Sequence, residues 1–491
     1  MNRERLIRTI HNNFALSPTV EQATAIDIFA DFLYDKNPRS IMILRGCAGT
    51  GKTTLAGAIV RALDELSYNT CLIAPTGRAA KVFSHYSDSQ ALTIHRRIYK
   101  KASDKNGIVH FTLDFNKAKN TLFIVDEASM ISNREESREQ YADADLQYGS
   151  GCLLDDLIRY VYDNGYRCKI LFMGDKAQLP PVGEAESCAL SADTFLGYGL
   201  ETYEHDLNEV LRQSEDSGIL WNATRIRQTG LPDLMFSPTS YIPKIRINGF
   251  SDIVCVAGNE LIESIDSSYR EVGIDETMIV TRSNKRANIY NEGIRRTILD
   301  RDARINSGDT LMVVKNNYFW VEKDEECPLA FIANGDRAIV KRLRNEHTLY
   351  GFTFANVTIE FPDYNNYEMT ALMLLDTLNT EAPALTSEQS NELYRQILED
   401  YTLQPDCPHD RKKLLAQVRD DMHYNAIQIK YGYAVTCHKA QGGQWCHIYI
   451  DQGYLPKENM DKEYIHWLYT AITRATEKVF LVNWNETQIE A

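Results

Sequence analysis

The sequence lacks the features that mark secreted, membrane-spanning or metal-stapled proteins. None of its ten cysteines forms a Cys-x-x-Cys pair, so neither a zinc site nor a disulfide framework is indicated. Its longest purely apolar runs, such as 371–375, fall far short of the roughly 20 residues that cross a bilayer. No apolar core follows Met1 to Arg5, which is not the pattern of a secretory signal. We therefore expect a cytoplasmic protein with reduced thiols and no membrane contact.

Positive charge is also scarce. The chain has 53 Lys and Arg against 68 Asp and Glu, a net charge of -15. Coating DNA by bulk electrostatics needs clustered Lys and Arg, so the composition excludes that mode of binding but leaves a narrow basic channel open. With 491 residues and 44% apolar content, the chain is too long for one hydrophobic core and should form three or four domains.

Short apolar runs alternate with helix-like segments, a rhythm typical of buried parallel sheets. Such runs occupy 41–44, 71–74, 122–125 and 170–173, and a second set occupies 253–256, 278–280, 434–435 and 479–482. The predicted fold class is therefore α/β with two cores. We place the first core at 1–200 and the second at 201–335 and 431–491.

Two stretches interrupt this rhythm. In the first, at 96–120, the pair Asn106-Gly107 precedes an alternating run, which is a strong signal for a β-hairpin. In the second, at 336–430, β-like runs at 352–361 and 369–375 mix with polar helical ones. We predict a hairpin insertion in the first core and a β-rich insertion in the second.

A phosphate-binding pattern follows the first apolar run. Gly46-Cys-Ala-Gly-Thr-Gly-Lys52-Thr53 matches G-x-x-x-x-G-K-[ST] and leads into a helical run. In such a loop the backbone N–H groups wrap phosphates, the lysine neutralises charge and the hydroxyl holds Mg²⁺. The candidate nucleotide-binding residues are Gly46, Ala48, Gly49, Thr50, Gly51, Lys52, Thr53 and Thr54.

Asp126 and Glu127 end a later apolar strand, at the sheet edge where the phosphate loop also lies. Asp126 suits a metal ion, and Glu127 suits the activation of an attacking water. An acidic pair at a strand end is more often a solvated turn, but the phosphate loop upstream favours the catalytic interpretation.

A P-loop does not by itself identify the work done. Together with Asp126 to Met130, five further segments resemble superfamily 1 helicases of the RecD-like and phage Dda-like group, in the family's order: Gln22 and the runs 74–80, 174–181, 436–442 and 469–475. The resemblance implies two RecA-like P-loop NTPase cores with parallel sheets and an SH3-like barrel as the second insertion. It also implies ATP and Mg²⁺ as cofactors, and a DNA helicase that moves 5′→3′ along single-stranded DNA, commonly as a monomer.

The resemblance assigns roles to single residues. Lys52, Glu127, Gln178, Arg212 and Arg474 would be catalytic, with Gln178 touching the γ-phosphate and Arg474 acting as the arginine finger. Gln22 would read the adenine, Gly442 would contribute to the nucleotide site, and Thr53 and Asp126 would hold Mg²⁺. DNA contacts would come from Pro75, Thr76, Thr93, His95, Thr436, His438 and Lys439. Taken alone, Gln22 and Arg212 could be surface residues, and Thr93 and His95 could be turn residues that cap a helix.

Other functions remain as alternatives. A P-loop phosphotransferase or signalling NTPase would use the same nucleotide site and would turn over ATP indifferently to DNA. A binding module built on a decayed ATPase should have lost residues such as Lys52 or Arg474. A third alternative is a nuclease-helicase, but no cluster of metal-binding carboxylates is apparent in the sequence outside the ATP site. The acidic helical stretch from Thr386 to His423 and the long segment 132–151 depart from the family pattern.

Overall fold

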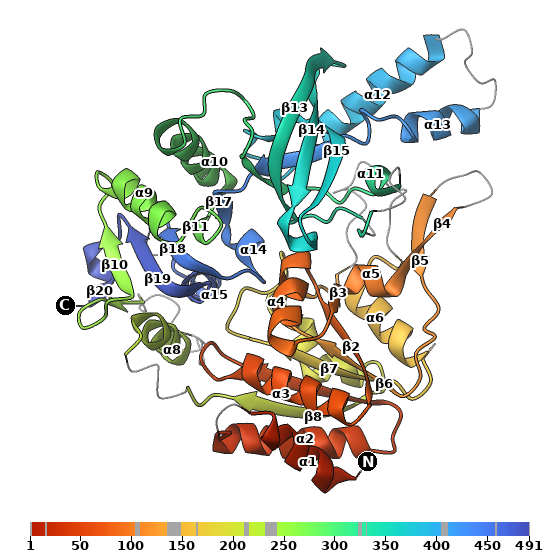
Figure 1. The fold of residues 1–491 in the computed structure, drawn as a ribbon, viewed down its shortest axis with the longest axis vertical. Coiled ribbons are helices and arrows are strands. Elements are labelled where there is room, and N and C mark those ends of the chain that lie inside the picture. Colours follow the sequence, from red (N-terminus) through yellow and green to blue (C-terminus); the bar gives the residue numbers. More distant parts are fainter. Residues whose placement is uncertain are drawn as a thin grey trace.

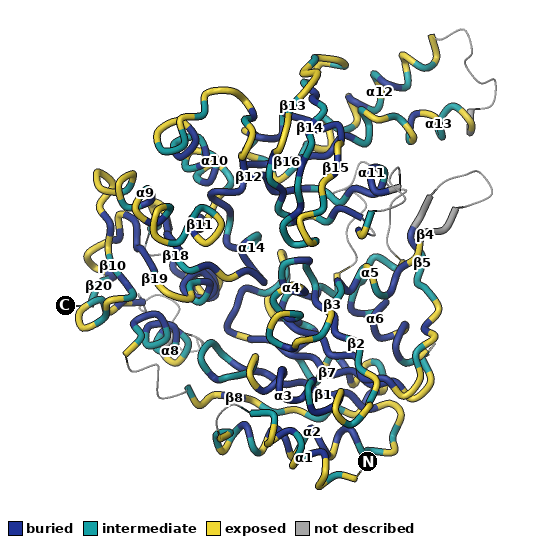
Figure 2. Tube along the Cα trace, in the orientation of Figure 1, coloured by how far each residue is buried: buried dark blue, intermediate teal, exposed yellow. Residues whose placement is uncertain are grey.

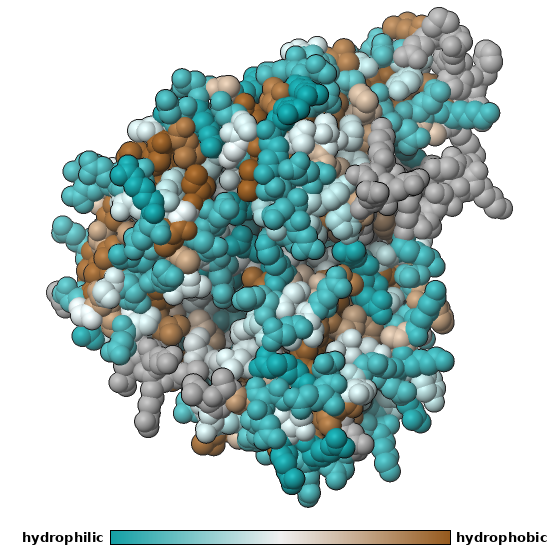
Figure 3. All heavy atoms as spheres, in the orientation of Figure 1, coloured by the Kyte–Doolittle hydropathy of each residue, from teal (hydrophilic) through white to brown (hydrophobic). Residues whose placement is uncertain are grey.

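The computed structural model describes residues 2–14, 17–103, 109–134, 149–163, 165–210, 216–230, 243–322, 327–329, 331–403, 411–456 and 459–490. Within them, every helix is too short or too polar to span a bilayer. Polar side chains cover most of the face seen in Figure 3, with scattered apolar patches between them.

Six parallel strands form the first sheet, in the order β3-β2-β6-β7-β1-β8 (Figure 1). The strands are β1 (Ser40–Gly46), β2 (Asn69–Ala74), β3 (Ala91–Thr93), β6 (Thr121–Val125), β7 (Lys169–Gly174) and β8 (Glu201–Leu207). The helices around them are α1 (Arg3–Asn12), α2 (Val20–Tyr34), α3 (Lys52–Glu65), α4 (Gly77–Ser87), α5 (Ile94–Ile98), α6 (Leu153–Tyr162) and α7 (Ala192–Leu196).

Both faces of this sheet are covered, which explains the continuous apolar runs of its strands (Figure 2). Along β1, Met42 and Leu44 pack with residues of α1 to α4, whereas Ile41 and Ile43 pack with residues of α5 to α7. The carboxyl ends of the strands meet at one edge, which is where the phosphate loop leaves β1.

The first core extends past its predicted limit at residue 200. Strand β8 pairs in parallel with β1, from Ser40 opposite Glu201 to Gly46 opposite Leu207. The sequence did not predict this strand, because most side chains of Glu201–Leu207 are polar and the segment has no apolar run. An edge strand needs no such run, since it has a neighbour on one side only.

Five parallel strands form the second sheet, in the order β10-β19-β18-β11-β17. They are β10 (Ile253–Val256), β11 (Thr277–Thr281), β17 (Ala434–Thr436), β18 (Trp445–Asp451) and β19 (Ala475–Val482). The accompanying helices are α8 (Gly218–Gly230), α9 (Leu261–Glu271), α10 (Asn284–Gly293), α14 (Cys437–Ala440) and α15 (Lys462–Ile472). The short strands β9 (Ile245–Arg246) and β20 (Ile489–Glu490) pair beside this sheet. The fold is thus α/β with two parallel cores, as predicted.

A closed five-stranded barrel interrupts the second core. Its strands are β12 (Thr310–Val313), β13 (Arg337–Leu349), β14 (Phe352–Phe361), β15 (Tyr367–Leu374) and β16 (Ile427–Tyr431), and α11 (Phe319–Glu322) follows β12. The helices α12 (Ser387–Leu403) and α13 (Arg411–Arg419) project from it (Figure 1). Because β12 pairs with both β13 and β16, the barrel begins at residue 310 rather than at the predicted 336.

Two antiparallel strands, β4 (Tyr99–Ser103) and β5 (Val109–Leu113), project from the first core. The predicted Asn106-Gly107 turn lies outside the described residues. Phe111 is buried with its ring centroid 4.3 Å from that of Tyr318, so it packs inside the protein. Phe115, just beyond β5, is 59% exposed.

Candidate active site

The phosphate loop joins β1 to α3. Gly49 and Gly51 have φ angles of 79° and 73°, in the left-handed region that side chains with a Cβ rarely adopt. Gly51 is the N-cap of α3, which begins at Lys52. The unpaired N–H groups of this helix end therefore face the loop, an arrangement that favours an anion.

Lys52 lies among carboxylates. Its Nζ is 3.8 Å from Asp126 Oδ1. Burial on its own would lower the pKa of Lys52, but the negative charges of Asp126, Glu127 and Asp175 outweigh it and raise that pKa. Lys52 is therefore a permanent positive charge beside the loop, as neutralisation of a triphosphate requires.

The two predicted acidic residues follow β6 and retain unused acceptor atoms. Tyr86 of α4 donates its hydroxyl hydrogen to Asp126 Oδ2. Asp126 Oδ1 and Glu127 Oε2 are buried and accept no hydrogen bond from any described residue. Buried acceptors without partners are costly, so this donor set fits a divalent cation and a water molecule. No sequence pattern singled out Tyr86, because it lies in an ordinary helical run.

Glu127 has the properties of a general base. Burial raises its pKa, although the nearby Lys52 and Arg474 charges oppose that rise. A carboxylate with a raised pKa accepts a proton more readily near neutral pH. Its backbone also adopts a positive φ of 50°, which turns it away from the direction of the strand.

Arg474 reaches this site from the second core. It follows α15, is 3% exposed, and places Nη1 3.8 Å from Glu127 Oε1. Its guanidinium also donates to the carbonyls of Thr470 and Gly443, which hold it in place. Gln178, in the loop after β7, is buried with no described partner for its Oε1. The site is thus assembled from both cores.

Gln22 is buried rather than exposed. Its Oε1 accepts the N–H of Thr19 and its Nε2 donates to the carbonyl of Thr50, both at 3.0 Å. It therefore connects the first turn of α2 to the phosphate loop. Its role in reading adenine stays a prediction.

Side chains of α15 contact the first core at three further points. Tyr469 bonds to the Ala48 N–H and to Asp175, Thr470 accepts the N–H of Leu179, and His466 lies 2.9 Å from the Ala177 carbonyl. No sequence pattern assigned a role to these three residues, because their partners are far away in sequence.

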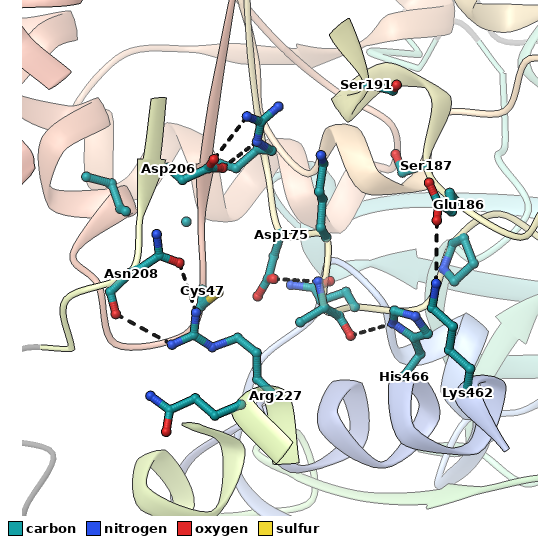
Figure 4. Close-up of a pocket in the computed structure, with 18 of the residues that line it drawn as sticks. Cys47, Asp175, Glu186, Ser187, Ser191, Asp206, Asn208, Arg227, Lys462 and His466 are labelled. Atoms are coloured by element: carbon teal, nitrogen blue, oxygen red, sulfur yellow. Dashed lines mark hydrogen bonds and ion pairs between the residues drawn. The ribbon is translucent and has the colours of Figure 1, made fainter. Parts of the chain in front are cut away.

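A cavity of about 540 Å³ lies beside the phosphate loop and is lined by both cores (Figure 4). Cys47 and Asn208 face Arg227 of α8 across it, and the Arg227 Nη1 donates to Asn208 Oδ1 at 3.1 Å. On the other side, Lys462 of α15 pairs with Glu186 at 3.4 Å. The space between the cores is therefore bridged by polar contacts on two sides.

The predicted DNA-binding residues of the first core lie at the amino ends of α4 and α5. Thr76 and Thr93 are N-caps whose hydroxyls accept the N–H groups of Ala79 and Arg96. The capping role considered for Thr93 is therefore present. His95 lies near the rings of Tyr99 and Phe331, and burial lowers its pKa to about 4, so it is neutral at pH 7.

The corresponding residues of the second core, Thr436, His438 and Lys439, lie at α14. The Lys439 ammonium is buried and donates to no described residue. Burial, followed by the nearby charge of Lys430, lowers its pKa to about 8. An unpaired ammonium of this kind can bind a phosphate.

Gly442 lies against Ala79 of α4 and Thr76, the N-cap of that helix, beside the predicted DNA contacts, so its assignment to the nucleotide rests on the motif alone. Arg212 lies outside the described residues, as do parts of the long segment 132–151.

Two family models match the chain. An AAA domain matches residues 19–139, which include the phosphate loop and Glu127. A UvrD-like helicase C-terminal domain matches residues 431–482, which include Lys439 and Arg474. The two models thus cover both Glu127 and Arg474, which face each other across the cleft.

Curated relatives extend the likeness to most of the chain. An uncharacterised protein of Acanthamoeba polyphaga mimivirus is 24% identical over 94% of this chain and 98% of its own length. The ATP-dependent RecD2 DNA helicase of Deinococcus radiodurans is 23% identical over 94% of this chain, which spans 48% of RecD2. The ATP-dependent DNA helicase Dda of phage T4 is 24% identical over 64% of this chain and 65% of Dda.

Among solved structures, two coordinating Pif1 helicases at forked double-stranded DNA align over 97% of this chain and 95% of the Pif1 chain, at 14% identity. The TM-score of this alignment is 0.45. The ordered motifs and these sequence matches make the chain similar to ATP-dependent DNA helicases of superfamily 1, in the RecD-like and Dda-like group.

Proposed function

We propose that this protein uses ATP to move 5′→3′ along single-stranded DNA and to unwind duplexes that carry a single-stranded tail. The observation that supports this most directly is the meeting of Arg474 and Glu127. Arg474 belongs to the second core and Glu127 to the first, yet they lie 3.8 Å apart in a buried cleft. A site divided in this way is complete only when the cores are together, which couples hydrolysis to their relative motion.

The chain's own residues divide the chemical work. The phosphate loop and Lys52 hold the triphosphate, Glu127 takes the proton of the attacking water, and Arg474 neutralises charge that develops on the transferred phosphoryl group. Thr53 and Asp126 would hold Mg²⁺, which supplies further neutralisation at the phosphates. Gln178, in the loop that contacts α15, would respond to loss of the γ-phosphate.

DNA would lie over the opposite part of the cleft. Thr76 and Thr93 come from the first core, and His438 and Lys439 from the second. Arg78 joins these two sides, because its guanidinium lies 4.2 Å from the ring centroid of Trp445 and donates to the Gln444 carbonyl at 2.7 Å. Opening and closing of the cores would therefore change the spacing of the phosphate contacts and shift the strand.

Strand separation is assigned to the β4–β5 hairpin. It projects from the first core, and packing of Phe111 against Tyr318 supports its base. A supported hairpin can hold the junction while the single strand is pulled past it. Stacking on the last base pair would offset part of the unpairing cost, at about 1–3 kcal/mol per base.

The test is the ATPase rate of the purified chain with and without single-stranded DNA, followed by unwinding of duplexes with either a 5′ or a 3′ tail. We expect DNA to stimulate turnover and the 5′-tailed duplex to be unwound. Turnover indifferent to DNA would instead support the phosphotransferase or signalling NTPase alternative. Preference for a 3′ tail would contradict the polarity alone. Unwinding at protein concentrations where sedimentation shows single chains would support action as a monomer.

A further inference from the structure

Among the described residues, the hydrogen-bond partners of one buried hydroxyl of the second core both lie in the first core. Tyr469 lies in α15 and is 1% exposed. Its hydroxyl oxygen accepts the backbone N–H of Ala48, in the phosphate loop, at 2.9 Å. The same hydroxyl donates to Asp175 Oδ2 at 2.6 Å. A single side chain thus connects α15 to the phosphate loop and to the loop that follows β7.

The β7 loop is held by α15 on both sides of Gln178. Asp175 uses its second oxygen, Oδ1, to accept the Ala177 N–H at 2.9 Å. Beyond Gln178, the Leu179 N–H donates to Thr470 at 2.8 Å and the Leu179 carbonyl accepts from Gln441 Nε2 at 2.6 Å. The position of Gln178 relative to the phosphates therefore depends on where α15 lies.

The same helix is linked to the DNA-facing side. Helix α14 carries His438 and Lys439, and Cys437 at its start contacts the Trp467 carbonyl of α15 through Sγ at 3.6 Å. A strand that moves α14 would thus move α15. The link is short, because Trp467 and Tyr469 are two residues apart.

We propose that Tyr469 is the positioning residue that couples DNA binding to ATP hydrolysis. Through its hydroxyl, the second core sets the geometry of the phosphate loop and of the Gln178 loop together. In this role Tyr469 acts through the two loops that its hydroxyl contacts. The inference rests on the proposed function, since it requires that DNA stimulate turnover.

The physical strength of the contact supports a measurable effect. Burial, and then the charge of Asp175, raise the pKa of Tyr469 well above its usual value, so the hydroxyl remains a donor at any working pH. A hydrogen bond to a carboxylate is stronger than one between neutral groups. Its removal also leaves a buried carboxylate oxygen and a buried N–H without this partner.

The test is Tyr469→Phe, which keeps the ring and removes the hydroxyl. We expect the DNA-stimulated kcat to fall by about tenfold to a hundredfold, with a much smaller change in KM for ATP. The ratio of DNA-stimulated to DNA-free turnover should fall with it. A purely structural role would instead lower the melting temperature and leave that ratio unchanged.

Tyr464→Phe is the matched control. Tyr464 is in the same helix and is also 1% exposed, but the partners of its hydroxyl in the described part of the chain are Gln452 and Gln488 of the second core. It should lose stability without losing DNA stimulation. If Tyr464→Phe reduces stimulation as much as Tyr469→Phe does, the proposed coupling is overturned.

Asp175→Asn gives a second route if Tyr469→Phe does not fold. It removes the charge that Tyr469 contacts and should reproduce the loss of DNA stimulation, and the double variant should be no worse than the poorer single one. Wild-type turnover that ignores DNA would overturn the proposed function itself. Wild-type stimulation that persists in Tyr469→Phe, or in Asp175→Asn where that is the variant that folds, would overturn only this inference.

Discussion

The two cores share an architecture but differ in the turn that follows a central strand. In the first core, β1 leads into a glycine-rich loop and α3, and two glycines adopt positive φ. In the second, β11 leads through Arg282 and Ser283 into α10, with the Ser283 hydroxyl capping the helix. A side-chain cap satisfies N–H groups that a phosphate would otherwise use. The same frame therefore binds a nucleotide in one core, while the other contributes Arg474.

The largest expected effect comes from removing the features unique to the first core. Lys52→Ala and Glu127→Gln should each abolish measurable turnover. The first removes the positive charge that neutralises the phosphates, and the second removes the proposed general base. Glu127→Gln should still bind ATP, which a fluorescent ATP analogue would report, and circular dichroism would verify the fold. Hydrolysis by Glu127→Gln at the wild-type rate would remove this residue from catalysis.

The second core's contribution is tested with Arg474→Ala. Because the guanidinium faces Glu127 across the cleft, its loss should lower the hydrolysis rate by about 10³ or more, the scale of a missing arginine finger. ATP affinity should change less. Steady-state kinetics separate the two outcomes, and a defect confined to binding would show that Arg474 is a ground-state phosphate clamp.

The β4–β5 hairpin of the first core sharpens the comparison further. Replacing 101–108 by a two-residue turn should abolish duplex unwinding, while DNA-stimulated ATPase and movement along single strands persist. Unwinding and translocation assays on the same preparation make the distinction. Unchanged unwinding would move the wedge elsewhere, most plausibly to the barrel insertion.

The smallest effect concerns pH. Burial lowers the pKa of Lys439 to about 8, so its side chain carries a positive charge below that pH and loses the charge above it. If contact with a DNA phosphate keeps Lys439 protonated in the complex, affinity for single-stranded DNA should fall by about tenfold between pH 7 and pH 9. Fluorescence anisotropy measures this, and Lys439→Arg, which stays charged, should show a flatter profile. Equal slopes for the two proteins would exclude Lys439 as the titrating group.

Some of the site was accessible from local sequence because its chemistry is local. The phosphate loop is a contiguous run whose glycines are needed where they stand, and Asp126 and Glu127 follow an apolar strand whose burial is visible in its composition. The parallel sheets could be predicted in the same way, because strands covered on both faces must be apolar throughout.

Only the tertiary structure decided which distant groups meet. The sequence did not predict strand β8, because this edge strand has mostly polar side chains. It also did not predict that β12 belongs to the barrel, because that follows from the pairing of β12 with β13 and β16 and not from the residues of β12. Tyr86 and Tyr469 look like ordinary helical tyrosines in sequence. Their hydroxyls find Asp126 and Asp175 because packing of whole helices brings them there, and a hydrogen bond between residues far apart in the chain leaves no local signal.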